Sequence, residues 1–344
     1  MQVFKFGGAS VKDAEGVQNV ARVMQLMGAE NKVMVVSAMG KTTNALERII
    51  DLYFAKDKKL HQAISDLKDY HNSILNNLFE TKAHPAYTKL NYFMDELEIF
   101  LDRNKSPNYD YVYDQVVSFG ELISTSLVSQ YLKSVGIKNT WLDCRNLIDT
   151  DDTYRDAKVN WQRTQTKIKA HVDEGELFIT QGFIGSDENN FTTTLGREGS
   201  DYTAAIFAYC LDAENVCIWK DVPGVLNGDP NVFKDTVLLN KISYEEAIEL
   251  AFYGASVIHP KTLQPLQQKE IPLFVKSFYH PENAGTAVQR ANLIEPLVPC
   301  YIVKKDLVLL SLSALDFSFF VEENMSEIFA LFHKYQIKVN MMQN

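Results

Sequence analysis

The chain has 344 residues, a length that suits two compact units or one large unit with an appendage. Its content of 46% hydrophobic and 23% charged residues is typical of globular proteins and excludes disordered, collagen-like and coiled-coil chains. Acidic residues outnumber basic ones by 44 to 34, and the resulting formal charge of −10 lacks the basic footprint that a nucleic-acid binder needs.

No apolar run approaches the length of a membrane span, and residues 1–6 lack the basic start and long apolar stretch of a signal peptide. The cysteines are scattered, without the close pairs of a zinc site or the density of a disulfide scaffold. We therefore expect a soluble cytoplasmic enzyme with reduced, mostly buried thiols.

Short β-rich runs alternate with helical stretches in the first third of the chain. Strands are predicted over residues 3–6 and 33–36, a helix over 13–27 between them, and a long helical region over 44–103. The histidines of that region have no partner at a spacing of four, so we expect solvated helix residues and not metal ligands at His61, His71 and His84.

Further buried strands are predicted over residues 177–180, 216–219 and 273–275, and residues 183–194 predict a hairpin between the first two. A helix is expected over 245–253, ending at Gly254. Strands that alternate with helices indicate a mostly parallel sheet covered by helices on both faces.

The composition changes between residues 280 and 299, where prolines bracket a polar stretch. We place a boundary there, which predicts domains over 1–290 and 300–344. The second domain contains a predicted strand, helix and strand over 307–312, 323–335 and 337–341.

Glycines and polar residues directly follow the predicted strands, at Gly7-Gly8, Ser37, Gln181-Gly182 and Lys220-Asp221. Ligands of open α/β sheets bind outside the carboxyl ends of the strands, and glycines there let backbone N–H groups approach a phosphate. One such glycine pair is usually an ordinary turn, whereas four such strand ends together favour a phosphate-binding edge.

The familiar phosphate-binding signatures are absent. The segment 40–42 resembles the end of a Walker loop, but Val35 stands where its first glycine is needed. No G-x-G-x-x-G sequence occurs, which argues against a dinucleotide-binding dehydrogenase, and the zincin and eukaryotic protein-kinase signatures are also missing.

The segment 192–205 carries the densest set of candidate residues. Ser200 or Asp201 can cap the following helix, while Arg197 is a candidate anion clamp and Asp201 a carboxylate near magnesium or a lysine. Glu121 follows a glycine at the predicted start of another helix. With Arg197 it supplies the acid and the base that a zwitterionic amino acid requires.

Together these residues resemble aspartokinases of the amino acid kinase superfamily, from Lys5 to about Val288. The motifs that carry the resemblance are, in chain order, KFGGAS at 5–10, VVSAMGKTTN at 35–44, SFGE at 118–121, ITQGFIG at 179–185, TTTLGREGSDYTAA at 192–205, WKDVPGV at 219–225, DP at 229–230, YGASVIHP at 253–260 and PLFVKS at 272–277. The residues after 300 resemble the opening βαβ of an ACT-type regulatory domain.

The resemblance implies an α/β fold, a three-layer αβα sandwich around a mostly parallel sheet with a partial ACT-like segment. It also implies ATP- and Mg²⁺-dependent phosphorylation of the L-aspartate side chain to 4-phospho-L-aspartate, the first step toward lysine, threonine and methionine. A side-chain carboxylate with a pKa of about 3.9 is ionised at neutral pH, so this reaction requires no general base.

Carried over residue by residue, the resemblance implies catalytic roles for Lys5 and Asp201, with Mg²⁺ held mainly by ATP. Glu121 would bind the substrate ammonium and Arg197 a substrate carboxylate, in a pocket completed by Ser37, Thr43 and Ser200. The implied nucleotide-binding residues are Gly7, Gly8, Ser10, Lys220, Asp221, Leu226, Asp229, Pro230 and Ser256.

Three positions depart from the family pattern, and they weaken the implied nucleotide contacts more than the implied substrate. Ser256 stands where many relatives carry a lysine, Asn231 where an arginine is common, and Lys220 where a threonine is common. We hypothesise that Lys220 replaces the charge missing at Ser256; the alternative is a solvated lysine beside Asp221.

Two other functions stay open at this point: a sibling kinase acting on glutamate, N-acetylglutamate or a nucleotide, and a catalytically silent amino-acid sensor. A fused homoserine dehydrogenase is excluded from this chain by its length and missing dinucleotide fingerprint. The partial ACT-like segment further predicts a truncated product of a longer gene, with weak or absent feedback inhibition by lysine or threonine. It also predicts an exposed half-sheet that becomes mobile or pairs with another chain, as in a homodimer.

Overall fold

The computed structural model describes residues 1–253, 258–291, 294–305, 307–313, 322–335, 337 and 339–343. Within these residues, an eight-stranded sheet has the order β3-β4-β2-β1-β7-β9-β10-β8, and β5 and β6 form a separate antiparallel pair. The strands are β1 (Gln2–Phe6), β2 (Lys32–Val36), β3 (Thr140–Leu142), β4 (Leu177–Gln181), β5 (Ile184–Ser186), β6 (Thr192–Thr194), β7 (Asn215–Lys220), β8 (Lys241–Ile242), β9 (Leu273–Ser277) and β10 (Thr286–Val288).

Every neighbouring pair in the large sheet is parallel except β9 with β10. All residues of β2 and β4 are buried, as expected for parallel strands covered on both faces. The five buried strands and the hairpin predicted from the sequence are confirmed. The short strands β3, β8 and β10 were not predicted, since none has an apolar run long enough to stand out.

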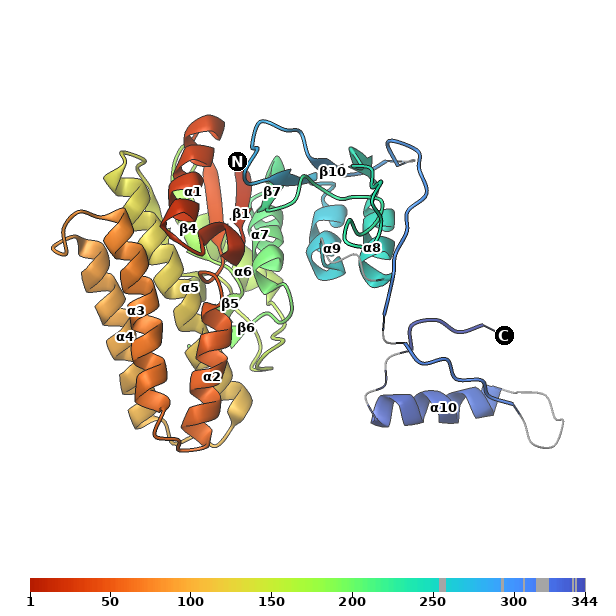
Figure 1. The fold of residues 1–344 in the computed structure, drawn as a ribbon, viewed down its shortest axis with the longest axis horizontal. Helices are drawn as coiled ribbons and strands as arrows, with labels where there is room; N and C mark the ends of the chain where they lie inside the picture. Colours follow the sequence, from red (N-terminus) through yellow and green to blue (C-terminus); the bar gives the residue numbers. More distant parts are fainter. Residues whose placement is uncertain are drawn as a thin grey trace.

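The helices form two layers on the sheet (Figure 1). The helix α5 contacts β2, β3 and β4 on one face, and α7 contacts β1, β2 and β7 on the other. This arrangement confirms the expected helix-sheet-helix sandwich. The helices are α1 (Ala14–Met27), α2 (Thr42–Phe54), α3 (Leu60–Leu78), α4 (Pro85–Arg103), α5 (Tyr109–Ser134), α6 (Trp161–His171), α7 (Gly199–Cys210), α8 (Tyr244–Tyr253), α9 (Pro260–Gln268), α10 (Glu322–Lys334) and the 3₁₀ turns η1 (Gly8–Val11) and η2 (Cys144–Asn146).

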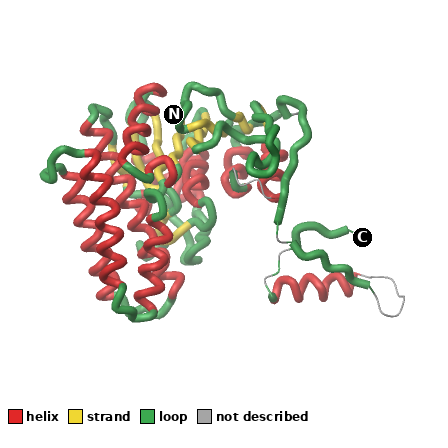
Figure 2. The backbone as a smooth tube through the Cα atoms, in the orientation of Figure 1, coloured by secondary structure: helices red, strands yellow, loops and turns green. Residues whose placement is uncertain are grey.

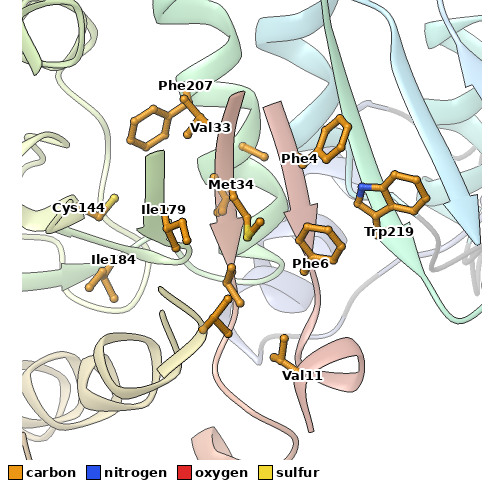
Figure 3. Close-up of a cluster of buried hydrophobic side chains, with 14 of the residues drawn as sticks. Phe4, Phe6, Val11, Val33, Met34, Cys144, Ile179, Ile184, Phe207 and Trp219 are labelled. Carbon is orange, nitrogen blue, oxygen red and sulfur yellow. The ribbon is translucent and has the colours of Figure 1, made fainter. Parts of the chain in front are cut away.

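Aromatic side chains hold the centre of the sheet together (Figure 3). Phe6 stacks almost parallel on Trp219 of the neighbouring strand, with ring centroids 6.1 Å apart. Phe278 meets Phe6 edge-on, with ring centroids 5.9 Å apart. These three side chains are buried, and their packing fixes the end of β1 against β7.

Two local predictions in the first third of the chain have different outcomes. The helix predicted from residue 13 is confirmed, with the Asp13 carboxylate accepting a hydrogen bond from the Gly16 N–H at 2.8 Å. The expectation of solvated histidines is wrong for His71, which is fully buried and hydrogen-bonded to the Leu67 carbonyl. Burial lowers the pKa of His71 to about 4, so this side chain is neutral.

The C-terminal segment follows the sequence prediction only in its helix, α10. The strand expected over 307–312 is not formed, and the described residues of 337–341 are not in a strand either. Figure 2 shows the described chain after β10 as loop apart from α10. Leu309 is 95% exposed, and an isolated extended segment without a paired neighbour does not form a stable strand. The division into domains 1–290 and 300–344 stays a prediction, and the predicted helix end at Gly254 lies outside the described residues.

Cysteine burial agrees with the expectation of free thiols. Cys144, Cys210 and Cys217 are buried and Cys300 is half-buried, and none is in a disulfide in the described part of the chain. Among the described helices, none combines the length and apolarity needed to cross a membrane.

We predict that Phe6→Ala lowers the free energy of unfolding by about 3–5 kcal/mol, because it opens a cavity between Trp219 and Phe278. The control is Leu26→Ala in α1, which removes a side chain that is 60% exposed and should change stability by less than about 0.5 kcal/mol. Urea unfolding followed by far-ultraviolet circular dichroism measures both values. Equal destabilisation by the two substitutions would contradict the central role of this aromatic cluster.

Candidate active site

Four parallel strands end side by side at one edge of the sheet. Phe6 pairs with Val36 and with Trp219, and Val36 pairs with Gln181. The residues that follow these strand ends therefore gather at a single place, as the sequence predicted. They line a cleft of about 560 Å³.

Nine of the predicted site residues line this cleft: Lys5, Gly8, Ser37, Thr43, Glu121, Arg197, Ser200, Asp201 and Lys220. They come from β1, β7, α2, α5 and α7 and from the loops between them. Segments more than two hundred residues apart in sequence, from Lys5 to Lys220, thus contribute to one site. The cleft also has lining residues that were not predicted: Ala38, Gly40, Tyr113, Arg155, Phe183, Gly196, Glu198 and Gly199.

Two lysines converge on one buried carboxylate in the cleft. The Lys5 ammonium lies 2.6 Å from Asp201 Oδ1, and the Lys220 ammonium lies 3.7 Å from Asp201 Oδ2. Asp201 is only 3% exposed. Burial alone would raise the pKa of Asp201, but the two lysines outweigh it and lower the pKa below its usual value. The cluster therefore holds an ionised carboxylate between two cations and has a net positive charge.

The loops around this cluster approach one another at backbone distance. A side chain at Gly8 would place its Cβ 2.6 Å from the Ala38 carbonyl oxygen. A Cβ at Gly182 would lie 2.4 Å from the Ser200 Cβ. Only glycine at these two positions lets the ends of β1, β2 and β4 close around the start of α7.

Glu121 lies in the middle of the 26-residue helix α5, so its predicted position at a helix start is wrong. One carboxylate oxygen accepts a hydrogen bond from the Ala38 N–H at 3.3 Å, and the other is buried without a hydrogen-bond partner among the described residues. Burial is the main cause that raises the pKa of Glu121 to about 8. Within the part of the chain that the structure describes, this acid has no ion-pair partner.

The start of α7 also differs from the prediction. Neither Ser200 nor Asp201 is the N-cap: that position is Glu198, whose backbone is left-handed with φ of 53° and whose side chain makes no capping bond. Ser200 and Asp201 therefore lie within the first turn of α7, and both line the cleft. Arg197, next to this turn, is exposed at the cleft.

Six predicted nucleotide-binding residues do not line the cleft: Gly7, Ser10, Asp221, Leu226, Asp229 and Pro230. Gly7 is adjacent to it, since a Cβ there would lie 3.5 Å from the Lys5 ammonium, and Ser10 is buried in η1. Leu226 forms a β-bridge with Leu238, and the Asp229 carboxylate accepts from the Asn231 N–H at 2.8 Å. Ser256 lies outside the described residues.

Besides Glu198, two further unpredicted cleft residues other than glycine have a left-handed backbone. Phe183 has φ of 73° and Arg155 has φ of 70°. The glycine before Phe183 is a local signal for a sharp turn, but Arg155 lies in a stretch without a recognisable motif. Its place beside Tyr113 depends on contacts between distant segments.

The charges of the cleft fit a polyphosphate and a zwitterion together. The net positive cluster at Lys5, Asp201 and Lys220 suits phosphate oxygens, and Glu121 suits an ammonium. Among the described residues, no group of three or more histidine, cysteine, aspartate or glutamate side chains is placed to hold a metal ion.

Comparison with known proteins agrees with this chemistry. Residues 1–277 match the model of the amino acid kinase family. The chain is 30% identical over 344 residues to the lysine-sensitive aspartokinase 3 of Escherichia coli (strain K12), covering 99% of this chain and 75% of that protein. It is also 30% identical over 325 residues to the chloroplastic aspartokinase 1 of Arabidopsis thaliana, covering 91% of this chain and 56% of that protein.

Solved structures give the same relationship. The aspartate and ADP complex of E. coli aspartokinase III (R-state) superimposes with a TM-score of 0.79 at 28% identity, covering 100% of this chain and 76% of that chain. The complex of E. coli aspartokinase III with lysine and aspartate (T-state) gives a TM-score of 0.76 at 32% identity, covering 85% and 65%. The chain therefore belongs to the amino acid kinase family and, within it, to the aspartokinases.

Proposed function

We propose that this chain transfers the terminal phosphoryl group of ATP to the side-chain carboxylate of L-aspartate, giving 4-phospho-L-aspartate and ADP. The observation that carries the proposal is the cleft itself, in which the Lys5–Asp201–Lys220 cluster lies with Glu121 and Arg197. The relationship to the E. coli enzyme, whose complex contains aspartate and ADP, supports the same pair of ligands here. A cytoplasmic location, where both substrates are present, goes with this activity.

The reaction requires positioning and charge neutralisation more than proton transfer. The attacking carboxylate is already ionised at neutral pH, so the main barrier is the approach of two anions. Lys5 is buried and close to the cleft floor, where a cation acts with little screening by water. We assign to Lys5 the neutralisation of charge on the transferring phosphoryl group.

Asp201 orients this cation. Its carboxylate contacts both lysines, so the positions of the two ammonium groups depend on a single buried side chain. Mg²⁺ would be carried mainly by the phosphates of ATP, where it supplies further charge neutralisation, with Asp201 as the nearby protein carboxylate.

Lys220 belongs to the same cluster. Its ammonium lies near Asp201, and its side chain is 22% exposed, which supports a role toward the phosphates over a solvated side chain beside Asp221. Whether it replaces the charge missing at Ser256 stays a prediction, because Ser256 lies outside the described residues. A lysine stem is long enough to bring its charge to a shared point from a different backbone position.

Glu121 and Arg197 fit the two ends of an amino acid. With a pKa raised to about 8, much of Glu121 is protonated at neutral pH in the free cleft. An incoming ammonium favours the ionised form, so substrate binding is coupled to release of the Glu121 proton. The exposed guanidinium of Arg197 is available for a substrate carboxylate, which it can bind in a bidentate manner.

We expect ADP release that depends on both aspartate and Mg²⁺, with hydroxylamine trapping the acyl phosphate as a hydroxamate. Glutamate and a reaction without acceptor are the controls, and both should be near background if aspartate is the acceptor. Turnover with glutamate but not aspartate would favour a sibling kinase. Absence of turnover with every acceptor in a folded, ATP-binding sample would favour the silent sensor.

Lys5→Ala and Asp201→Ala should each lower kcat by about 10²–10³-fold, the usual loss for one partner of transition-state charge. Glu121→Ala and Arg197→Ala should instead raise the KM for aspartate by about ten-fold or more, because each leaves a substrate charge unpaired. Steady-state kinetics with each substrate varied in turn measures both effects. Near-normal kcat in Lys5→Ala, or unchanged aspartate KM in Arg197→Ala, would show that the assigned role is wrong.

We further propose a homodimer formed through the C-terminal segment, with lysine or threonine as the effector class. Val308 and Leu309 are 83% and 95% exposed, and such apolar side chains side by side favour association with another chain. The E. coli relative is lysine-sensitive, which supports lysine as an effector.

Leu309→Asp should shift the molar mass measured by size-exclusion chromatography with light scattering from dimer toward monomer, because it places a charge in the apolar contact. Ser311→Asp, two residues away and also exposed, introduces the same charge at a polar position and should leave the dimer intact. A monomeric parent chain, or equal dissociation by both substitutions, would contradict this assembly.

A further inference from the structure

Asp114 is a fully buried carboxylate that faces neither lysine of the cleft. It lies on α5 seven residues before Glu121, which places both side chains on the same face of that helix. Tyr113, its neighbour in sequence, lines the cleft. Asp114 is therefore close to the substrate end of the site without lining it.

The Asp114 carboxylate accepts hydrogen bonds from two segments of the chain. The Arg155 N–H lies 3.2 Å from Oδ1 and 3.0 Å from Oδ2. From the other segment, the Thr194 N–H donates to Oδ2 at 2.7 Å and the Thr194 hydroxyl donates to Oδ1 at 2.8 Å. Every one of these contacts uses a carboxylate oxygen as an acceptor, a pattern that an amide cannot reproduce.

The first of these segments carries Arg155 into the cleft. Arg155 has a left-handed backbone with φ of 70°, an uncommon conformation for a residue other than glycine, which the surrounding contacts must hold in place. Its guanidinium lies 4.4 Å from the centre of the Tyr113 ring and 3.3 Å from the exposed Asp110 carboxylate. The guanidinium thus stands at the cleft while the backbone is tied to Asp114.

The second segment leads to Arg197. Thr194 ends β6, and Arg197 follows three residues later. The two segments are also joined to each other, because the Ala157 N–H donates to the Thr194 carbonyl at 2.9 Å. A shift of the Asp114 carboxylate would therefore move both arginine-bearing turns.

We propose that Asp114 is a positioning residue for the substrate end of the cleft, setting the places of Arg155 and Arg197, and that Arg155 is a second cation for the substrate. This inference rests on the proposed function. An acidic amino acid with two carboxylates presents more negative charge than one arginine can pair, and two guanidinium groups at one cleft match that class of substrate.

Asp114→Asn should raise the KM for aspartate by about 10–100-fold. The substitution replaces a charged acceptor with a neutral amide, whose NH2 group is a donor and cannot accept the hydrogen bonds that one carboxylate oxygen accepts. The value of kcat should stay within about three-fold and the KM for ATP should not change, because Lys5 and Asp201 keep their geometry. Arg155→Ala should raise the aspartate KM in the same direction, and the double variant should be less impaired than the product of the single effects.

The matched control is Asp110→Asn, one helical turn earlier on α5. Asp110 is exposed and contacts Arg155 only through the side-chain ion pair, so its loss should change the aspartate KM by less than about three-fold. Equal effects of Asp110→Asn and Asp114→Asn on a folded protein would overturn the proposal. So would an Asp114→Asn variant in which the aspartate KM is unchanged or the KM for ATP rises equally.

A substrate-free measurement separates this inference from the proposed function. Trypsin cleaves after arginine, and release of the Arg155 turn in Asp114→Asn should speed cleavage at Arg155 several-fold, whereas Asp110→Asn should not. Inactivity of the parent chain toward aspartate would contradict the proposed function. The rate of trypsin cleavage at Arg155 would still test the role of Asp114. If Asp114→Asn does not fold, Thr194→Val is the deciding variant, because it removes only the hydroxyl that donates to Asp114. It should raise the KM for aspartate a few-fold. An unchanged KM would overturn the proposal.

Discussion

The active cleft depends on a buried ion pair between Lys5 and Asp201. A carboxylate that is 3% exposed needs hydrogen-bond donors or a cation beside it to stay ionised, and Lys5 lies 2.6 Å from Asp201. The lysine comes from the first strand and the aspartate from the first turn of α7, so the pair sets the position of that helix against the sheet. The remaining side chains of the cleft are arranged around this contact.

The environment of Glu121 differs from that of the Lys5–Asp201 ion pair. Glu121 is buried with one oxygen lacking a hydrogen-bond partner among the described residues, an arrangement that costs free energy in the empty cleft. Burial raises the pKa of Glu121 to about 8, which favours the neutral form of the carboxyl group. In the proposed function, a substrate ammonium would pair with this oxygen and remove the penalty.

The C-terminal segment contrasts with the sheet. Strand-like apolar runs in the first 290 residues find neighbours on both sides, and their side chains are buried between helices. The run around Leu309 has the same composition, yet the described residues there lie exposed and form no strand. An apolar run becomes a strand only where another strand supplies hydrogen-bond partners, and this information is not contained in the run itself.

The sequence by itself determined the parallel sheet, the edge at which the site lies and most of its charged residues, because apolar periodicity and residues after strand ends are local features. It predicted that Lys5, Asp201, Glu121 and Arg197 belong to the site, but not which contacts they make. It misplaced Glu121 within α5, whose start is marked by the N-cap Asn108, a local signal that was missed. It also misplaced the cap of α7, because the N-cap Glu198 makes no side-chain capping bond. Only the tertiary structure decided the burial of His71, the convergence of Lys220 on Asp201 and the approach of Arg155 to the cleft. Each of these depends on distances between residues far apart in the chain, which are fixed by packing against the sheet and by buried polar groups that must find partners.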